Sequence, residues 1–341
     1  MSKYKILMLS TLPIKPIGPS RGTPVLEYTI RGFVKSGWQV HFLAGFKPEP
    51  EYDLDSSSIL LTWFSLDKLV RLSEIRKLGY FFRFLLAVGY FGCFLLKGIK
   101  VAFREDVDLI YAWDPYSSVP GKVLSLLFGK PLVTRILGTS LKEKDLNIFY
   151  KIRRWHIVLS YKFHGSLIVM TNDGTQGDKV LRKLGIDMQK VRFWMNGVDR
   201  DHFRVLPNRD VSRERLKVRR RHVLLCISRL ANWKRVDRSI NALPRVIERH
   251  PDTILIVVGD GSERKRLEKL AAELGVLDYV RFEGAVPHHE IPKYYAAADI
   301  FLSFYDWSNV GNPLLEAMMS GKCIVTLNNG CLLYTSPSPR D

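Results

Sequence analysis

The sequence predicts an α/β protein built from two doubly wound parallel sheets. Short apolar runs rich in β-branched residues alternate with longer amphipathic stretches, which is the pattern of parallel strands joined by helices. The alternation is interrupted once, between Asn196 and His222. The chain has 341 residues. At roughly 150 residues per domain, this length accommodates two domains.

The expected elements follow the chain in two series. Strands of the first series are expected at 5–9, 40–44, 109–112, 132–135, 167–171 and 192–195, and strands of the second at 223–227, 254–258, 280–282, 300–303 and 324–327. Helices are expected at 23–36, 175–184, 237–249, 262–274 and 291–297. We therefore predict one domain over 1–196, an interdomain connection over 197–222 and a second domain over 223–330.

A further helix is expected over 81–103, and it is unusually apolar. Its uninterrupted apolar run, 84–96, is shorter than the roughly 20 residues that cross a bilayer. We therefore interpret its apolar face as buried in the first domain. The basic residues around it are Arg71, Arg76, Lys77, Arg83, Lys97 and Arg104. For these residues a solvated surface and contact with anionic headgroups are equal alternatives.

The formal net charge of +18 indicates an anionic partner, such as nucleic acid, an anionic membrane surface or a phosphorylated ligand. The sequence contains no helix-turn-helix, zinc-finger or RNP-like motif, so nucleic acid is not expected. The four cysteines lack C-x-x-C spacing and an adjacent His cluster, so no metal site is expected and a reducing compartment fits better. Residues 1–13 lack a signal-peptide core, and we expect a cytoplasmic protein.

Chemistry-bearing residues follow three strands of the second series. Arg229 and Lys234 follow its first strand, Gly259-Asp260-Gly261 follows its second, and 305–318 follows its fourth. Because ligands of open parallel sheets bind beyond the carboxyl ends of the strands, these three loops are expected to form one site.

The segment around Pro313 predicts a helix start suited to an anion. Asn312 suits an N-cap and Pro313 the first helical position. The N–H groups of Leu314 and Leu315 would then be free to bind an anion. Glu316, one turn further, could accept hydrogen bonds from ligand hydroxyls. Together with the two cations that follow the first strand, this arrangement suits a diphosphate without a metal ion.

An ordered set of motifs extends over most of the chain. In the second half these are Ser228-Arg229-Leu230 with Lys234, Val258-Gly259-Asp260-Gly261, Phe282-Glu283-Gly284, Ala298-Asp299-Ile300, and Gly311 through Met318 with Gly321. Weaker ones in the first half are Gly22-Thr23, Gly37-Trp38-Gln39-Val40, and Asn196-Gly197-Val198-Asp199 with Phe203. The set resembles glycosyltransferase family 4, whose retaining nucleotide-sugar transferases have the GT-B fold of two Rossmann-like domains facing an interdomain cleft.

The resemblance implies a hexosyltransferase that moves a sugar, with retention, from a nucleoside-diphosphate sugar to a lipid-linked or polysaccharide acceptor, as in polysaccharide biosynthesis. Arg229, Lys234 and Glu316 would form the catalytic group, with the two cations replacing a metal ion and Glu316 binding the donor ribose. No cofactor is implied. The implied donor-binding residues are Gly22, Thr23, Gly259, Asp260, Gly261, Ser308, Asn309, Gly311, Asn312, Pro313, Leu314 and Leu315. Candidates on the acceptor side are Asp114, Arg135 and Gly138.

The sequence departs from the family pattern at three positions, one of which is Asp114, at a strand end where a histidine is also common. Ser308 stands where the family often has a glutamate seven residues before the second one, and Leu137 stands where a histidine often precedes the glycine. Tyr305, Asp306, Asn309 and Asn312 are alternative polar contacts for the sugar. The departures keep two other functions open: a sugar-nucleotide-binding scaffold with impaired catalysis, and a sugar-nucleotide epimerase of the same fold.

The last residues carry no element that the resemblance implies. Residues 331–341 are rich in Ser and Pro and lack helical periodicity. We expect them to be a non-native tail and the second domain, 223–330, to be incomplete. We expect a cytoplasmic enzyme that is peripheral on the inner membrane face. No residue pattern specifies the nucleotide base, the sugar, the acceptor or the oligomeric state.

Overall fold

The computed structural model describes residues 4–12, 24–47, 58–73, 79–307 and 310–327. These residues form two compact units, of which the first ends at Met195 and the second begins at Asn196. Asp173–Thr175 also belong to the second unit.

The first unit contains a sheet of seven described strands in the order β3-β2-β1-β4-β5-β6-β7, and every pair of neighbours is parallel. The strands are β1 (Tyr4–Ser10), β2 (Trp38–Ala44), β3 (Ile59–Trp63), β4 (Leu109–Ala112), β5 (Leu132–Ile136), β6 (Leu167–Thr171) and β7 (Val191–Trp194). In the interior strand β1, Ile6, Leu7, Met8 and Leu9 are fully buried, as the apolar run predicts for a strand covered on both faces.

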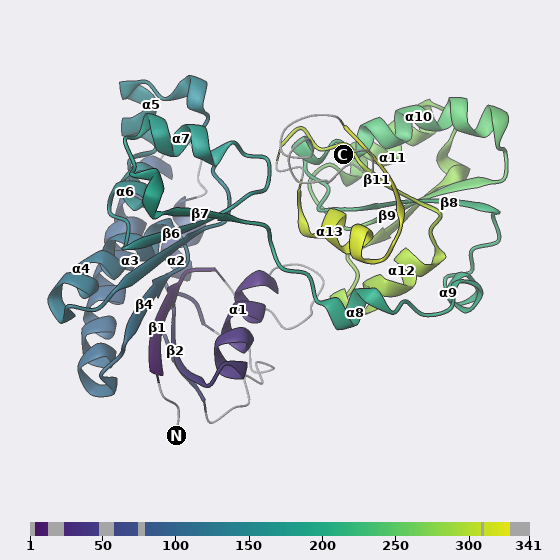
Figure 1. Ribbon diagram of the computed structural model, residues 1–341. Coiled ribbons are helices and arrows are strands. Elements are labelled where there is room, and N and C mark those ends of the chain that lie inside the picture. The colour runs from purple at the N-terminus through teal and green to yellow at the C-terminus, as the bar shows by residue number, and fades with distance from the viewer. Residues whose placement is uncertain (1–3, 13–23, 48–57, 74–78, 308–309, 328–341) are drawn as a thin grey trace. The chain divides into compact units, whose positions relative to one another are not determined.

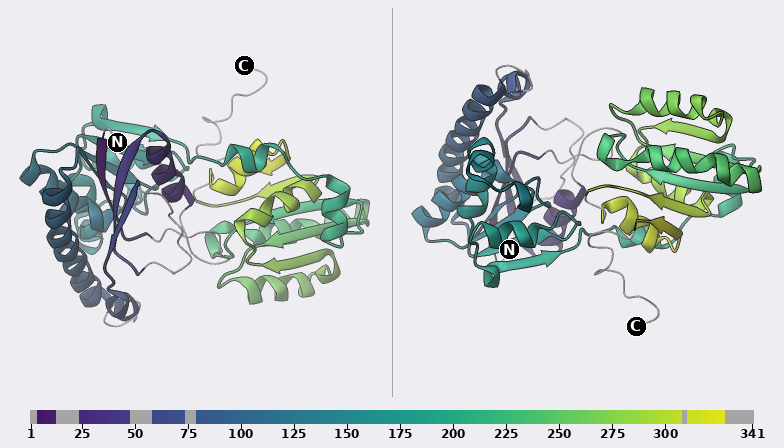
Figure 2. Two further views of the ribbon diagram at one scale, coloured as in Figure 1. Left: turned by 90° about the horizontal axis from the view of Figure 1, so that it is seen from below. Right: turned by 90° about the horizontal axis from the view of Figure 1, so that it is seen from above.

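Helices cover both faces of this sheet. They are α1 (Pro24–Lys35), α2 (Asp67–Ser73), α3 (Gly79–Glu105), α4 (Pro115–Phe128), α5 (Ile148–Arg153), α6 (Trp155–Lys162) and α7 (Gly177–Lys183). Ile6 and Met8 pack in the cluster that includes residues of α1, whereas Leu7 and Leu9 pack in the cluster that includes residues of α3 and α4. The two-residue period of β1 thus places α1 and α3 on opposite faces (Figures 1 and 2).

The second unit contains a sheet of five described strands in the order β10-β9-β8-β11-β12, again with parallel neighbours. The strands are β8 (His222–Ile227), β9 (Thr253–Val258), β10 (Val280–Gly284), β11 (Ile300–Ser303) and β12 (Cys323–Thr326). The helices are α8 (Arg200–Arg204), α9 (Arg209–Arg215), α10 (Val236–Arg249), α11 (Arg264–Glu273), α12 (Ile291–Ala297) and α13 (Asn312–Met319). Both sheets have the parallel α/β organisation that the alternating pattern predicts (Figure 1).

The segment 197–222, which we predict as a connection, contains α8 and α9 within the second unit. Phe203, Leu216 and Val218 are buried in the core cluster that also holds residues of β8 and α12. Arg213 donates a hydrogen bond to the carbonyl of Ala297. The basic side of this segment is therefore partly structural.

Helix α3 is buried on one side only. Leu86, Tyr90 and Phe94 are buried against the sheet and α4. The exposed apolar residues of α3 are Phe81, Phe84, Val88, Leu96, Ile99 and Phe103. The interpretation of its apolar surface as buried is thus correct for one face and wrong for the other, because this helix is apolar nearly all round. By length and composition alone, Phe81–Glu105 could also cross a membrane, and only 28% of its apolar window is buried.

Candidate functional site

Two loops of the second unit are tied together at the carboxyl edge of its sheet. The N–H of Ser228 donates to the carbonyl of Val258, and the N–H of Leu230 donates to the carbonyl of Asp260. Gly259 in turn donates to the carbonyl of Gly284 at the end of β10. The loops that follow β8 and β9, two of the three loops predicted to form one site, are therefore joined to each other and to the end of β10.

Gly259 and Gly261 allow these loops to approach each other. Gly259 has a φ of +126°, and a Cβ there would lie 2.0 Å from the carbonyl oxygen of Ser228. A Cβ on Gly261 would lie 2.3 Å from the carbonyl oxygen of Leu230. Only glycine fits at these two positions without moving the neighbouring backbone.

We therefore expect the substitution Gly259→Ala to lower the free energy of unfolding by at least about 3 kcal/mol, because backbone strain and a backbone clash add. Gly275→Ala is the matched control: Gly275 has a φ of +67° but no atom within 4 Å of its Cβ position. It should cost only about 1 kcal/mol. Urea unfolding measures both values. Equal losses in the two variants would contradict the close approach of the loops.

Lys234 lies between two aromatic rings. It ends the short 3-10 helix Asn232–Lys234, and its Nζ is 4.1 Å from the centroid of the Trp233 ring and 3.7 Å from that of the Tyr305 ring. Burial, followed by the charge of nearby Arg229, lowers the pKa of Lys234 to about 7. Arg229 itself is exposed. The two cations thus lie within electrostatic reach of each other, as predicted, and ring faces stabilise the charged amine.

Two of the alternative polar contacts have partners within the protein. Tyr305 is buried, and its hydroxyl donates to the carbonyl of Ile227 over 2.9 Å. Asp306 forms ion pairs with Arg235 at 3.0 Å and with Arg238 at 2.7 Å. These contacts fix the loop after β11 on α10, so both residues have structural roles.

Glu316, on α13, is buried with 5% of its surface exposed. Its Oε1 lies 3.0 Å from Nε2 of His288, and its Oε2 accepts a hydrogen bond of 3.2 Å from the hydroxyl of Tyr295. Neither His288 nor Tyr295 is among the site residues predicted from the sequence. The position of His288 just after β10, at the edge already used for the other loops, was the signal that could have identified it.

The start of α13 differs from the prediction. The helix begins at Asn312, and the N-cap is Gly311, which has no side chain to bond the backbone. The N–H groups of Leu314 and Leu315 both donate to the carbonyl of Gly311, so the expectation that they are free is wrong. Asn312 is the first helical residue rather than the cap, and its side chain accepts a hydrogen bond of 3.0 Å from Asn196.

The acceptor-side candidates lie in the first unit. Asp114 is buried and caps α4, since its carboxylate accepts hydrogen bonds from the N–H groups of Thr11, Tyr116 and Ser117. Arg135 is buried with its guanidinium 5.8 Å from the centroid of a Trp ring, and burial lowers its pKa.

Arg135 donates to the hydroxyl of Thr171, while its Nε has no partner among the described residues. Gly138 has a φ of +75°. Gly22, Thr23, Ser308 and Asn309, together with the tail 331–341, lie outside the described residues.

The site of the second unit therefore combines two cations with a hydrogen-bonded buried carboxylate. It can bind a doubly charged anion beside a group that accepts hydrogen bonds. Among the residues that the structure describes, no group of three or more His, Cys, Asp or Glu side chains is placed to hold a metal ion.

Comparison with known proteins identifies relatives over nearly the whole chain. Residues 24–202 match the model of the family described as "Glycosyltransferase Family 4", and residues 208–335 match that of "Glycosyl transferases group 1". The GDP-mannose-dependent alpha-(1-6)-phosphatidylinositol monomannoside mannosyltransferase of Mycolicibacterium smegmatis is 37% identical over 142 residues, which are 39% of this chain and 37% of the relative. Glycogen synthase of Mycobacterium tuberculosis is 27% identical over 69% of this chain and 55% of its own length.

Solved structures share the fold. HepE of Anabaena in complex with UDP-glucose matches with a TM-score of 0.71 at 22% identity, over 98% of this chain and 83% of HepE. Sucrose-phosphate synthase from Thermosynechococcus elongatus matches with a TM-score of 0.70 at 18% identity, over 98% and 83%. The fold is thus of the GT-B class, with two Rossmann-like domains. Since one family model alone covers more than half of the sequence, the chain belongs to glycosyltransferase family 4.

Proposed function

We propose that the protein transfers a sugar from a nucleoside-diphosphate sugar to an acceptor hydroxyl with retention at the anomeric carbon. The observation that carries the proposal is the placement of Lys234 and Arg229 at the strand edge that also holds Glu316. In this reaction the bond between the anomeric carbon and the β-phosphate oxygen breaks. The acceptor oxygen bonds to that carbon, and its proton passes to the leaving nucleoside diphosphate.

The two cations have a direct role in this proposal. Negative charge grows on the β-phosphate as the bond to the sugar breaks, and cations held in place beforehand stabilise that charge. Lys234, held between the rings of Trp233 and Tyr305, and Arg229 would supply this stabilisation. We therefore propose that transfer does not require a metal ion. Glu316 would accept hydrogen bonds from the ribose hydroxyls.

The names of relatives support classes of donor and acceptor. The mannosyltransferase is named for GDP-mannose and for a phosphatidylinositol monomannoside, and HepE was solved with UDP-glucose. We therefore propose guanosine or uridine diphosphate as the leaving group and a lipid-linked or polysaccharide acceptor, with the lipid-linked class favoured.

Nucleotide binding tests this function directly. We expect UDP, GDP or ADP at about 100 times its dissociation constant to stabilise the protein by about 2.7 kcal/mol, seen as a rise in Tm by thermal shift. The rise should persist in EDTA, because the phosphates are bound by side-chain cations. An absolute requirement for Mg²⁺ would contradict the role of Arg229 and Lys234. Absence of a shift with all three nucleotides would exclude both transfer and nucleotide binding.

Two other functions are each favoured by one observation. Ser308 in place of a glutamate favours a binding scaffold with impaired catalysis. The His288–Glu316 pair supplies the acidic and histidine side chains that an epimerase would use. Incubation with the donor alone distinguishes the three functions. A transferase slowly hydrolyses the donor and releases free sugar, whereas a binding scaffold releases none. An epimerase instead forms an epimerised sugar nucleotide.

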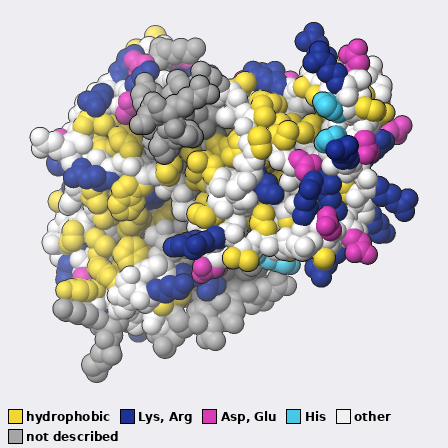
Figure 3. Space-filling model, turned by 45° about the vertical axis from the view of Figure 1, so that its right-hand side comes forward, with side chains coloured by type: hydrophobic (Ala, Val, Ile, Leu, Met, Phe, Trp, Pro, Cys, Tyr) yellow, Lys and Arg dark blue, Asp and Glu magenta, His cyan; other side chains and the backbone are white. Residues whose placement is uncertain are grey.

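The location that we propose is the cytoplasm, at the inner face of a membrane. The net charge of +18 supports attraction to anionic lipid. Figure 3 shows Lys and Arg side chains in several separate groups on the visible face, rather than in one patch. The exposed apolar face of α3 gives the first unit a surface that could enter the headgroup region.

A further inference from the structure

The outward side of α3 is an apolar stripe. Phe81, Phe84, Val88, Leu96, Ile99 and Phe103 recur at three-, four- and eight-residue spacings, which places them on one side of the helix. Leu96 is 72% exposed and Phe103 is 82% exposed. A helix that is apolar on its outer face as well as its inner one is suited to contact something other than water.

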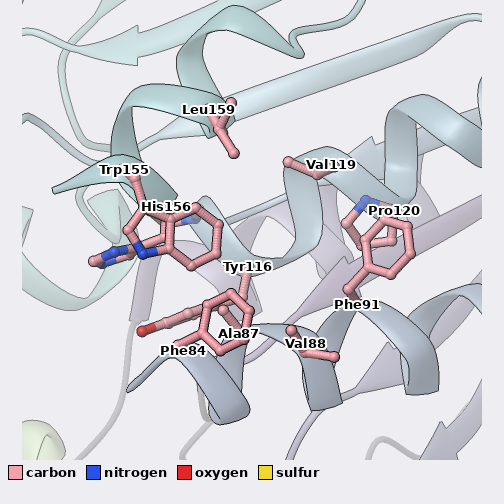
Figure 4. A pocket seen from close by; sticks show the side chains of 11 residues that line it. Phe84, Ala87, Val88, Phe91, Tyr116, Val119, Pro120, Trp155, His156 and Leu159 are labelled. Atoms are coloured by element: carbon pink, nitrogen blue, oxygen red, sulfur yellow. The ribbon is translucent and has the colours of Figure 1, made fainter. Parts of the chain in front are cut away.

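An apolar pocket opens beside the N-terminal half of this stripe. Its volume is about 240 Å³, and α3, α4 and α6 each contribute side chains (Figure 4). The lining residues are Phe84, Ala87, Val88, Phe91, Pro115, Tyr116, Val119, Pro120, Trp155, His156 and Leu159. A pocket of this volume can hold part of one hydrocarbon chain.

The few polar groups of the pocket are neutral. His156 stacks on Tyr116 with ring centroids 5.6 Å apart and an angle of 7° between the rings. Burial, with help from the charges of Arg154 and Arg83, lowers the pKa of His156 to about 4, so the imidazole is uncharged at pH 7. Trp155 packs against Phe84, with ring centroids 5.8 Å apart. The lining is therefore uncharged and favours hydrocarbon over a polar ligand.

The helices that carry this apolar surface are strongly basic. Within their described bounds, helices α3 to α6 carry Arg83, Lys97, Lys100, Arg104, Lys122, Lys151, Arg153 and Lys162, and Glu105 is their only acidic residue. An anionic bilayer complements both the charge and the apolar stripe. A second copy of the chain, packed face to face, would bring these basic residues against one another.

The pocket also lies at the functional edge of the first unit. Pro115 and Tyr116 begin α4 directly after Asp114, which caps the helix at the carboxyl end of β4. A lipid chain that enters the pocket from this end would have its headgroup near the strand ends, where ligands of parallel sheets bind.

We infer that this pocket binds one hydrocarbon chain of an anionic bilayer lipid, while the α3 stripe lies in the interfacial region of the bilayer. The charges of Arg83 and Arg154 act on His156 in the pocket lining, and they would favour an anionic lipid over a neutral one. The binding of a chain does not require the proposed transfer reaction, so the two can fail separately.

Brominated lipids test the pocket. Vesicles of phosphatidylcholine and phosphatidylglycerol with brominated acyl chains should quench the fluorescence of Trp155, because bromine quenches tryptophan on contact. The Trp155→Phe variant should lose the larger part of the quenching seen in the wild type. The Ala87→Phe variant fills the pocket. It should abolish the quenching of Trp155, while the protein still sediments with the vesicles. Ala272→Phe, at an exposed position of α11, is the matched control and should behave like the wild type.

The stripe has its own test in the same assay. Phe103→Glu should weaken sedimentation with anionic vesicles about tenfold, whereas Phe103→Leu should not. Vesicles of phosphatidylcholine alone should bind weakly, and added salt should release the protein from anionic ones. Sedimentation with equal quenching in the wild type, Trp155→Phe and Ala87→Phe would overturn the pocket and leave the membrane location standing. Dimerisation in ultracentrifugation, with no vesicle binding, would overturn both.

Discussion

Replacing Lys234 by alanine is expected to lower kcat/KM for sugar transfer by about 10²–10³-fold, the loss typical of removing one electrostatic stabiliser of a transition state. The amine lies between the rings of Trp233 and Tyr305 and near Arg229, so no other described lysine occupies that position. Initial rates with the donor found by nucleotide screening measure the effect. Lys265→Ala, at an exposed site of α11, is the matched control and should leave kcat/KM unchanged.

The pKa of Lys234 gives this prediction a second readout. In the folded protein burial lowers it from 10.5 to about 7, so the free site loses its charge as the pH rises through about 7. A bound diphosphate favours the charged amine and restores the proton. Between about pH 7 and 10, nucleotide binding should therefore take up a proton and weaken with rising pH. Calorimetry in two buffers of different ionisation enthalpy measures the uptake, which Lys234→Arg should abolish.

The lowered pKa of Lys234 also distinguishes loss of activity from loss of folding in the Lys234→Ala variant. A lysine whose folded pKa is lowered destabilises the protein fully below pH 7, and this cost disappears as the pH rises toward 10.5. Lys234→Ala should therefore be at least as stable as the wild type at pH 6 in urea unfolding. Wild-type turnover in a stable Lys234→Ala protein would contradict the role proposed for this residue.

The substitution Glu316→Gln is expected to weaken nucleoside-diphosphate binding about 10- to 100-fold, because hydrogen bonds to a charged group contribute about 1.5–3 kcal/mol. The amide cannot accept at both oxygen positions, where His288 and Tyr295 now contact the carboxylate. Titration with the nucleoside diphosphate, which lacks the transferred sugar of the donor, measures the ribose contact without any contribution from that sugar. Tyr295→Phe keeps the carboxylate and should change this affinity little. Equal affinity in Glu316→Gln and the wild type would remove Glu316 from the ribose site.

Strand ends were the part of the site that the sequence predicted best. Arg229, Lys234 and Gly259 follow strands whose apolar runs are unmistakable, and parallel strands bring their carboxyl ends to one edge. The cap of α13 was mispredicted because Gly311 and Asn312 both suit an N-cap, and only the backbone path decides between them.

Two other features could not be predicted from neighbouring residues in the sequence. His288 and Glu316 are 28 positions apart, so their contact depends on how β10 and α13 are placed in the fold. The outward face of α3 escaped prediction for a different reason. Hydrophobic periodicity identifies a buried face by contrast with a polar one, and α3 offers little contrast from Phe84 to Leu96.

Asp299 connects the segment that follows the first unit to the second sheet. Its carboxylate forms ion pairs with Arg209 and Arg213 of α9, and it also accepts a hydrogen bond from the N–H of Val223 at the start of β8. Opening α9 would leave a carboxylate beside the sheet without its cations, in addition to exposing Leu216. Opening of α9 therefore costs both these charge contacts and the burial of Leu216, which couples α9 to the second sheet.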